Sequence, residues 1–308
     1  MRLLVVGAGA VGGYFGGRLA QAGRDVTFLV RNRRAAQLRE RGLEIVSPHG
    51  DATISPKVVT RDQLSGSYDL ILLAVKNHGL KTSLDDIAPA VGPDTLIFPA
   101  LNGMHHLEEL KAKFAVSNLL GGVCVVATTL DAQGRVVQLT GMQKLVYGEL
   151  DGSRSLRIEA VDRALQGAGF EAQLSTHIVL DMWEKFVFIA ALAGITCLLR
   201  GSVGEIAAAP RGRELALAMH DECVSVGKAC GYEPRSQAIE SVRAMLTQAD
   251  STLTSSMYRD LQKGAALEAD AIVGEMCQRV ETAGLRLPLL SAAYAQLAIF
   301  ERRRAKSE

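Results

Sequence analysis

A glycine-rich loop that directly follows the apolar run Leu3–Val6 and opens a helical stretch is the feature of this sequence most suggestive of chemistry. In that setting the first glycine permits a tight turn, the second lets a ligand approach the backbone, and the third lets helix and strand pack closely. Phosphate binds where such a helix begins, because its free N–H groups and dipole favour an anion. The loop therefore predicts a dinucleotide site, with a merely tight strand-to-helix turn as the alternative. Its residues are Gly7, Ala8, Gly9, Ala10, Val11 and Gly12.

The residue that follows the second apolar run, Val26–Val30, indicates which dinucleotide the loop binds. An NAD site carries Asp or Glu about twenty residues after the glycines to hold the ribose hydroxyls. This chain instead has Arg31, with Arg33 and Arg34 close behind it. Guanidinium groups pair well with a 2′-phosphate, so we expect NADP(H) as the cofactor. The alternative is that these arginines lie on an exposed helix start.

Two polar side chains follow later strands of the same half. Lys76 comes after the run Leu70–Val75, and Asn102 comes after the run Thr95–Ala100. Ligands of open α/β sheets bind at the carboxyl ends of the strands, so we expect both residues to be directed at the cofactor. Taken singly, a lysine or an Asn-Gly pair after a strand is usually an ordinary turn.

Lys185 stands where a polar helix start meets the apolar run Phe186–Leu199. We expect its ammonium group to be partly removed from water, which lowers the pKa of a lysine. A lowered pKa suits a general acid that works near neutral pH. The alternative is a lysine whose stem packs on a core helix while its charge reaches solvent. The apolar run itself is too short for a membrane span and is expected to be a buried core helix.

Ser256 and Glu268 are two further polar candidates in the second half of the chain. Ser256 could equally cap a helix that begins near Met257, and Glu268 could equally lie on the exposed face of that helix. Residue type and spacing do not decide between these structural roles and a role in a site.

The first half alternates short β-rich runs with helical stretches, which predicts a parallel sheet covered by helices on both faces. This α/β arrangement is the one that places a glycine loop at the end of the first strand. Three more β-rich segments are expected to complete the same sheet. The expected strands are Leu3–Val6, Val26–Val30, Leu70–Val75 and Thr95–Ala100, and the completing segments are Val123–Thr128, Val136–Thr140 and Lys144–Gly148.

After Thr176 one helical pattern follows another, which predicts an all-helical second domain. Ser175 and Thr176 are suitable N-cap residues for the helix that carries Lys185, so the boundary is expected there. We therefore expect an NADP-binding domain over residues 1–175 and a helical substrate domain over residues 176–308. Later helices are expected at Arg211–Cys230, Ser236–Gln248, Met257–Ala283 and Leu289–Arg304.

Composition and charge favour a globular protein that acts on a small molecule. Lysine and arginine total 34 against 33 acidic residues, so no long-range field attracts nucleic acid or anionic lipid. The five cysteines lack the paired spacing of a metal site and are expected to be reduced core thiols. Leu3 follows the start too closely for a signal peptide, so we expect a cytoplasmic protein. The apolar helices of the second half suit either a core or the interface of a homodimer.

Taken together, these residues resemble the ketopantoate reductase family, which reduces 2-dehydropantoate to pantoate with NADPH on the route to coenzyme A. The order and spacing of the motifs carry the resemblance, which covers nearly the whole chain. It implies a Rossmann-type first domain and an all-helical second domain like the C-terminal domain of 6-phosphogluconate dehydrogenase. The matching motifs are the glycine loop, Arg31, Lys76, Asn102-Gly103-Met104, Trp183-Glu184-Lys185, Gly204-Glu205, Ser255-Ser256-Met257 and Glu268.

The resemblance also implies a role for each candidate residue. Lys185 would give a proton to the substrate carbonyl oxygen, and Glu268 would hold both Lys185 and the substrate hydroxyl. Ser256 would bind substrate, and Lys76 and Asn102 would line the junction of nicotinamide and substrate. A cationic donor beside the carbonyl oxygen would stabilise the negative charge that hydride transfer creates there.

The chain departs from the family at three positions. The best-known members carry asparagines one and two turns beyond the lysine, where this chain has Ile189 and Ala193, and another before the Gly-Glu pair, where it has Val203. Residues i, i+4 and i+8 share a helix face, so the surface beside Lys185 is expected to be apolar. Reduction of a less polar 2-oxo acid or ketone is therefore the alternative to reduction of 2-dehydropantoate. A non-catalytic protein that senses NADP is a further alternative, disfavoured by Lys185 and Glu268.

Overall fold

The first four predicted strands, together with β5 (Lys57–Val59), form one parallel sheet in the computed structural model, which describes residues 1–280 and 284–306. Its strands are β1 (Arg2–Val6), β2 (Asp25–Leu29), β5 (Lys57–Val59), β6 (Leu70–Leu73) and β7 (Leu96–Pro99). They lie in the order β5-β2-β1-β6-β7, and each neighbouring pair is parallel. On β1, Leu3 and Val5 enter one core while Leu4 and Val6 enter another. Burial on both faces explains the continuous apolar runs and confirms the predicted Rossmann-type sheet.

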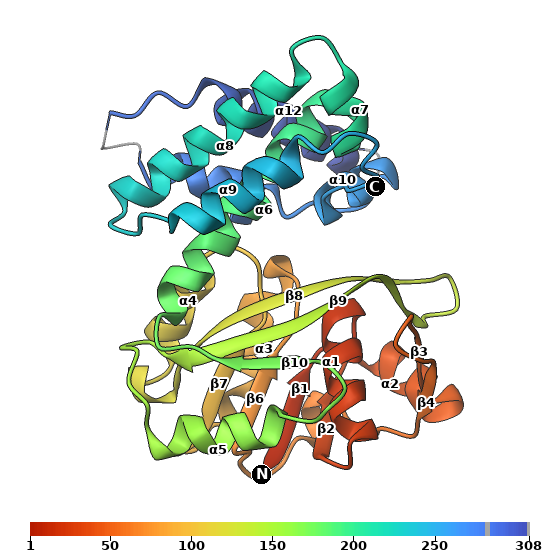
Figure 1. Ribbon diagram of the computed structural model, residues 1–308. Helices are drawn as coiled ribbons and strands as arrows, with labels where there is room; N and C mark the ends of the chain where they lie inside the picture. The colour runs from red at the N-terminus through yellow and green to blue at the C-terminus, as the bar shows by residue number, and fades with distance from the viewer. Residues whose placement is uncertain (281–283, 307–308) are drawn as a thin grey trace. The chain divides into compact units, whose positions relative to one another are not determined.

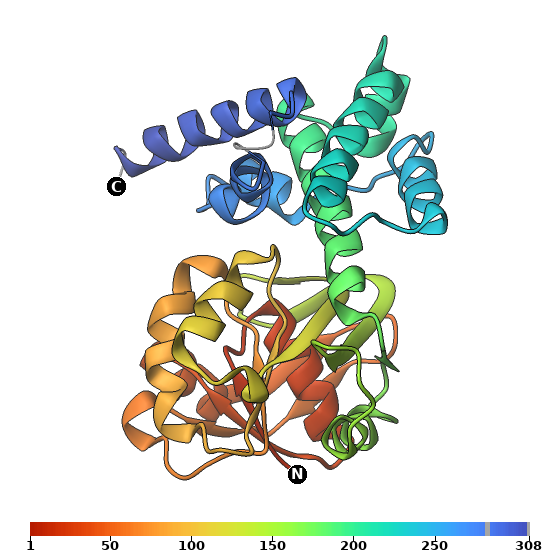
Figure 2. The ribbon, with the colours of Figure 1, turned by 90° about the vertical axis from the view of Figure 1, so that its left-hand side faces the viewer.

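Helices cover both faces of this sheet. They are α1 (Ala10–Gln21), α2 (Asn32–Arg41), α3 (Leu80–Ile87) and α4 (His105–Lys113), whereas α5 (Leu156–Leu165) packs on β10 (Glu171–Leu174) of a second sheet. The apolar residues of α1, α2 and α5 belong to one core, and those of α3 and α4 belong to the other. In Figure 2, α3 and α4 (orange and yellow) lie on the opposite side of the sheet from α1 (red). The sheet is thus the middle layer that orients the glycine loop.

A second sheet contains the later β-rich segments, so the prediction that they complete the first sheet is wrong. Its strands are β3 (Leu43–Val46), β4 (Ala52–Ile54), β8 (Leu120–Leu130), β9 (Val136–Glu149) and β10 (Glu171–Leu174). The strand β9 pairs with β8, β10 and β3, and Figure 1 shows β8 and β9 as long neighbours. The segments Val136–Thr140 and Lys144–Gly148 are parts of this one strand, which continues through Gly141. A β-rich pattern identifies a strand, but it does not say which sheet the strand joins.

Helix α1 lies between the two sheets, and its glycines make the close packing possible. A Cβ added to Gly16 would lie 2.7 Å from the Phe28 ring of β2. A Cβ added to Gly17 would lie 2.7 Å from Ile45 of β3. Because protein interiors are already close-packed, side chains at these positions would push the sheets away from the helix. The glycines of α1 therefore set the spacing of both sheets around the loop that precedes this helix.

The chain divides into two units. Unit 1 comprises Met1–Leu101 and His106–Val179, and unit 2 comprises Asn102–His105 and Leu180–Glu308. Both sheets belong to unit 1. The short segment Asn102–His105 belongs to unit 2, although the residues on either side of it belong to unit 1.

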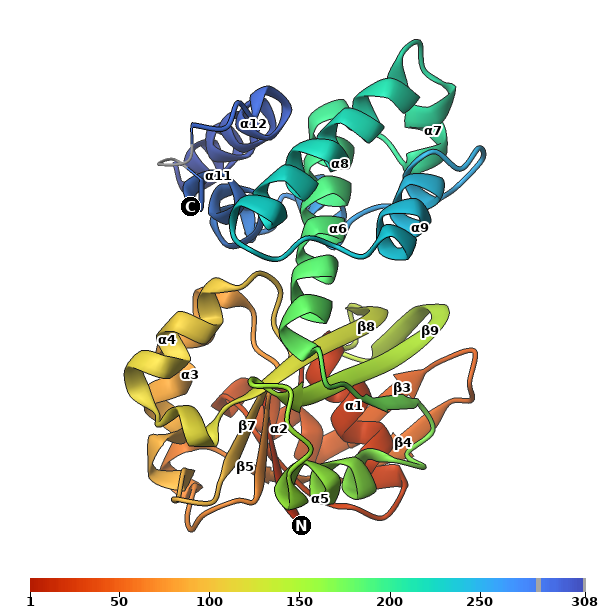
Figure 3. The ribbon, with the colours of Figure 1, turned by 60° about the vertical axis from the view of Figure 1, so that its left-hand side comes forward.

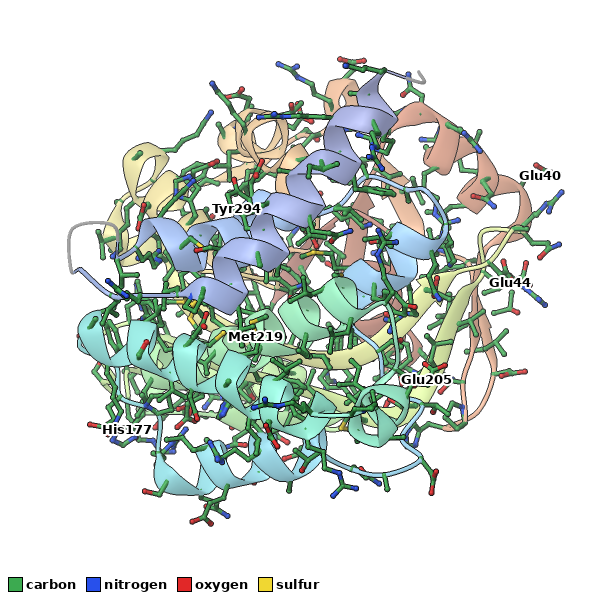
Figure 4. All side chains as sticks on the ribbon, turned by 90° about the horizontal axis from the view of Figure 1, so that it is seen from above. Glu40, Glu44, His177, Glu205, Met219 and Tyr294 are labelled. Atoms are coloured by element: carbon green, nitrogen blue, oxygen red, sulfur yellow. The ribbon has the colours of Figure 1, made fainter. Side chains whose placement is uncertain are left out.

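Unit 2 is built from helices, as predicted. They are α6 (Ile178–Leu199), α7 (Val203–Ala208), α8 (Gly212–Ala229), α9 (Ser236–Leu246), α10 (Ser256–Gln262), the π-helix Asp270–Gly274, α11 (Glu275–Gln278) and α12 (Pro288–Ala305). Helix α8 packs on α6, since a Cβ on Gly194 would lie 2.9 Å from the sulfur of Met219. Figure 3 shows α8 crossing beside α6, and Figure 4 labels Met219. By length and composition alone α6 could cross a membrane, but 67% of its most apolar window is buried within the protein, as in a core helix.

The continuous helix expected over Met257–Ala283 is wrong. Helix α10 ends at Gln262, and residues 263–268 are not helical. Gly264 has φ +68°, a left-handed conformation that ends helices. The chain then enters the π-helix and α11, while residues 281–283 lie outside the described residues.

The expected N-cap of α6 is also wrong, because the helix begins at Ile178 rather than directly after Ser175 and Thr176. The Ser175 hydroxyl oxygen accepts the N–H of His177 at 3.0 Å, so it closes a local turn ahead of the helix. The serine hydroxyl accepts a backbone N–H in such a turn just as it does in an N-cap. For this reason the residue types alone suggested a helix start at this point.

All five cysteines are free thiols, and three of them, Cys124, Cys197 and Cys223, are buried. Burial raises the pKa of the Cys197 thiol to about 11 and raises that of Cys223 well above its ordinary value. Both groups therefore stay protonated near neutral pH, as expected of core thiols. Cys230 and Cys277 are half-buried.

We expect Gly16→Ala to lower the free energy of unfolding by about 1–3 kcal/mol, because its methyl group would overpack the space against Phe28 and Val5. Gly9→Ala is the matched control. No described atom lies within 4 Å of a Cβ at Gly9, and its φ of −81° suits alanine. Urea unfolding of the two variants checks the prediction, and equal stabilities would contradict this account of α1.

Candidate active site

The glycine loop has the geometry that a pyrophosphate requires. Gly7 has φ +92°, which favours glycine, and turns the chain from β1 toward α1. A Cβ on Gly12 would lie 2.0 Å from the Gly7 carbonyl oxygen, whereas no described atom lies within 4 Å of a Cβ on Gly9. Gly9 is the N-cap of α1 and has no side chain to occupy the helix start, and the first turn holds no acidic residue. The first N–H groups of α1 therefore suit an anionic ligand, which fits a dinucleotide.

Arg31 and Lys76 lie at the same edge of the parallel sheet as the loop, because they follow β2 and β6, the two neighbours of β1. Both side chains are exposed. A Cβ on Gly79, in the turn that begins after Lys76, would lie 4.0 Å from the Arg31 guanidinium. Unit 1 thus brings the glycine loop, Arg31 and Lys76 to one edge of the sheet, with positive charge that fits a phosphorylated ligand.

Arg34 has a different role from the one that its place in the sequence suggests. Its Nε donates to the carbonyl oxygen of Ala8 at 3.0 Å, and its Nη1 donates to the carbonyl oxygen of Gly134 at 2.8 Å. Burial lowers the pKa of this guanidinium below its ordinary value. Arg34 braces the glycine loop against the turn between β8 and β9. Arg31 and Arg33 are the exposed guanidinium groups of this sequence cluster.

Helix α6 carries Lys185, Ile189 and Ala193 on one face. Lys185 and Ile189 are half-buried, whereas Ala193 is 2% exposed. Val203, the first residue of α7, is 1% exposed. Of the three apolar departures, Ile189 is the one that keeps an accessible side chain, one helical turn from Lys185.

Ser255, not Ser256, caps helix α10, so the structural alternative considered for Ser256 is wrong. The Ser255 hydroxyl oxygen accepts the N–H of Tyr258 at 3.0 Å. It also lies 2.9 Å from the hydroxyl oxygen of Thr196 on α6. The beginning of α10 is thereby held against α6, and the side chain of Ser256 is exposed.

Glu268 is half-buried and lies among the non-helical residues that precede the π-helix, not on an exposed helix face. The preceding residue, Leu267, donates its N–H to a carboxylate oxygen of Glu301 on α12 at 2.9 Å. Tyr294 of α12, labelled in Figure 4, donates its hydroxyl to Asp270 at 2.7 Å. The segment that carries Glu268 is therefore tied to α12 on both sides.

Asn102 lies in the segment of the first half that joins unit 2. The next residue, Gly103, packs against the π-helix, and the N–H of Met104 donates to Oε2 of Glu275 at 3.0 Å. The structure thus brings the Asn102 turn to the start of α11. Glu275 was not among the residues predicted from the sequence. The available signal was a charged pair of opposite sign, Glu275 and Arg279, four residues apart after the apolar run 271–273.

Comparison with known proteins identifies the family. Residues 3–152 match the family described as ketopantoate reductase PanE/ApbA, and residues 177–301 match its C-terminal domain. The uncharacterized oxidoreductase YkpB of Bacillus subtilis is 38% identical over 303 residues, which cover 98% of this chain and 99% of that protein. The solved 2-dehydropantoate 2-reductase of Geobacter metallireducens is 26% identical, with a TM-score of 0.87 and coverage of 97% and 99%. A D-mandelate dehydrogenase solved with NADH and anilino(oxo)acetate shares the fold at 21% identity, with a TM-score of 0.89 and coverage of 99% and 100%.

A Rossmann-type unit with an accessible glycine loop and a helical second unit define a dinucleotide-dependent oxidoreductase of 2-oxo and 2-hydroxy acids. The chain belongs to the ketopantoate reductase family, as its motifs predicted, and its cofactor is NADP(H). The alternative of a protein that only senses the nucleotide is thereby set aside.

We expect kcat/KM to be higher with NADPH than with NADH by about tenfold or more, because the exposed Arg31 replaces the acidic ribose ligand of NAD sites. Arg31→Asp should reduce or reverse this preference. Arg34→Asp is not a suitable control because that side chain braces the loop, so Arg33→Asp is used and should have the smaller effect. Equal kcat/KM values with both cofactors in the unmodified protein would contradict the argument from Arg31.

Proposed function

We propose that this protein is a cytoplasmic reductase that converts 2-dehydropantoate to pantoate with NADPH, on the route to coenzyme A. The observation that carries the proposal is Lys185, a half-buried cation at the border of an apolar core helix. A lysine in this position is suited to act on a carbonyl oxygen, where hydride transfer builds negative charge. Family membership supports the reaction type and the substrate class.

Each proposed residue has a defined part in this reaction. When bound, the reduced nicotinamide supplies a hydride to the carbonyl carbon, which forms the new C–H bond. Lys185 gives its proton to the carbonyl oxygen, which receives the electron pair of the broken C=O π bond, and it then regains a proton from solvent. Glu268 holds the Lys185 ammonium group and the substrate hydroxyl. Asn102 and Ser256 bind the polar groups of the substrate.

The cofactor itself is held by unit 1 in this proposal. The residues from Gly7 to Gly12 and the start of α1 hold the pyrophosphate, and Arg31 pairs with the 2′-phosphate. Lys76, at the same edge of the sheet, would line the junction of nicotinamide and substrate. The open space at Gly9 supports this assignment, because a backbone without a Cβ lets the pyrophosphate approach closely.

A specific observation favours a second candidate substrate, a less polar 2-oxo acid. Ile189, Ala193 and Val203 are apolar where the family's best-known members have asparagines, so they offer no hydrogen bonds to a hydroxylated substrate. A D-mandelate dehydrogenase of the same fold, solved with anilino(oxo)acetate, is consistent with an aromatic 2-oxo acid. The discriminating experiment follows NADPH oxidation against 2-dehydropantoate, phenylglyoxylate and branched aliphatic 2-oxo acids. If the protein turns over none of these compounds, the proposed function is wrong.

We expect Lys185→Ala to lower kcat by about two to four orders of magnitude, the usual cost of losing a general acid. NADPH binding should remain nearly unchanged, because the lysine acts on the carbonyl and not on the nucleotide. Lys263→Ala, at an exposed lysine of the same unit, is the control and should keep full activity. Residual activity of Lys185→Ala within a few-fold of the unmodified protein would show that the proton comes from another group.

The apolar face of α6 generates a prediction about specificity. If Ile189 and Ala193 set substrate choice, 2-dehydropantoate should have a KM well above the usual range of about 1 μM to 1 mM. The double variant Ile189→Asn with Ala193→Asn should raise kcat/KM for 2-dehydropantoate and lower it for apolar 2-oxo acids. Because Ala193 is 2% exposed, the added amide should also destabilise the substrate-free protein by about 1–3 kcal/mol.

Steady-state kinetics on both substrate classes and melting temperatures with and without substrate test this prediction. Efficient reduction of 2-dehydropantoate by the unmodified protein would mean that other residues supply the polar contacts. The second candidate substrate would then be excluded, while the reaction type would stand.

A further inference from the structure

A buried carboxylate of unit 2, Glu275 at the start of α11, joins two segments that carry proposed site residues. The residue is 6% exposed. Its Oε2 accepts the N–H of Met104 at 3.0 Å, two residues after Asn102. Its Oε1 accepts from Nε and Nη2 of Arg279 at 2.9 and 2.6 Å. A carboxylate this deeply buried needs charged and hydrogen-bonding partners, and each oxygen of Glu275 has one.

The turn that Glu275 holds is fitted closely to the helix. Gly103 has φ +83°, and a Cβ there would lie 2.3 Å from the carbonyl oxygen of Ala271 in the π-helix. The same Cβ would lie 2.7 Å from Oε2 of Glu275. The backbone of the turn therefore rests directly on the π-helix and on the carboxylate. Little freedom remains for the position of Asn102, the residue just before this contact.

The other oxygen of Glu275, Oε1, binds Arg279, which in turn contacts helix α6. The Arg279 guanidinium lies over the Trp183 ring, 5.3 Å from its centroid. Trp183 is 2% exposed and stacks on Tyr232, with centroids 5.2 Å apart and ring planes 14° apart. Trp183 lies two residues before Lys185 on α6. The cation–π contact and the stack therefore fix the segment of α6 that carries the proposed proton donor.

We propose that Glu275 is a positioning residue for the reduction, acting on Asn102 through Met104 and on Lys185 through Arg279 and Trp183. The proposal rests on the proposed function, because it assumes that Asn102 and Lys185 act on the substrate. Glu275 itself makes no contact with substrate in this role. Its effect comes from the accuracy with which two proposed site residues are held, on which the rate of an oriented reaction depends strongly.

Glu275→Gln is the informative substitution because it changes neither size nor shape. A glutamine has one acceptor oxygen and one donor nitrogen. If the glutamine oxygen accepts the N–H of Met104, the amide nitrogen faces the N–H groups of Arg279, and donor meets donor. In the reverse orientation the amide nitrogen faces the N–H of Met104, and donor again meets donor. The variant must therefore lose one of the two contacts.

The chain offers a matched control in Glu222 of α8. Its two carboxylate oxygens accept the N–H groups of Leu289 and Leu290 at 3.0 and 2.9 Å, at the start of α12. Glu222→Gln also breaks one carboxylate contact to backbone in unit 2, but the described hydrogen bonds of this carboxylate go to the start of α12 and not to the Asn102 turn. Any general loss of stability caused by such a substitution should appear in both variants.

The experiment compares Glu275→Gln with Glu222→Gln by kinetics, by NADPH affinity and by tryptophan emission. Trp183 is the one tryptophan of the sequence, so its fluorescence reports this position without any ligand. For Glu275→Gln we expect kcat/KM for the 2-oxo acid to fall about tenfold or more, with NADPH affinity nearly unchanged and emission shifted. Glu222→Gln should leave kcat/KM and emission unchanged. When Asn102→Ala is already present, Glu275→Gln should lower kcat/KM by a smaller factor than it does in the unmodified protein, as expected of coupled residues.

Two results would overturn the proposal: a kcat/KM for Glu275→Gln equal to that of Glu222→Gln, or unchanged emission of Trp183. If the fold-losses in kcat/KM of Glu275→Gln and Asn102→Ala simply multiply in the double variant, the two residues are not coupled. That result would contradict the proposal that Glu275 positions Asn102 through Met104. If the unmodified protein reduces no 2-oxo acid, the proposed function fails instead. The emission comparison still decides, without catalysis, whether Glu275 orders the segment around Trp183.

Discussion

The contact between α1 and β1 is the constraint on which the rest of unit 1 depends. At Gly12 even a methyl group has no room, because it would lie 2.0 Å from the carbonyl oxygen of Gly7. On its other faces α1 meets Phe28 of the parallel sheet and Ile45 of the second sheet. The helix start, whose N–H groups suit a pyrophosphate, is thus fixed by the close packing of the α1 backbone between two sheets, and Arg34 braces the loop before it. A site fixed in this way loses little conformational freedom when it binds its cofactor.

Unit 2 fixes its loops by a different means, which is carboxylates that accept backbone N–H groups. Glu275 accepts from Met104, and Glu301 accepts from Leu267, next to Glu268. Such charge-assisted hydrogen bonds are short and directional, so they hold non-helical backbone in a helical unit. The irregular segments that carry Asn102 and Glu268 are therefore ordered by residues that are themselves distant from them in sequence. This arrangement explains how a helical unit can carry Asn102 and Glu268 on loops, while Lys185 and Ser256 lie on α6 and α10.

Features with local signals could be predicted from the sequence, and those that depend on distant partners could not. The glycine loop and Arg31 are recognisable because the fingerprint and the spacing to the end of β2 lie within one supersecondary unit. The break after α10 was missed because Ala265 and Ala266 favour helix, although Gly264 is a local signal for a helix end, and the Leu267 N–H pairs with the distant Glu301 of α12. The role of Glu275 depends on a partner, Met104, from the other half of the chain. The second sheet was missed for the same reason, since β9 pairs with β3 across a long stretch of sequence.

As a 2-oxo acid reductase, this chain transfers hydride from NADPH to the carbonyl carbon of its substrate. The most direct measurement is product analysis by mass spectrometry and NMR after incubation with NADPH deuterated at the transferable position and each 2-oxo acid of the panel. We expect one 2-hydroxy acid to form for each NADPH consumed, with a single deuterium at C2. Oxidation of NADPH without formation of a hydroxy acid, or a product without deuterium at C2, would contradict it.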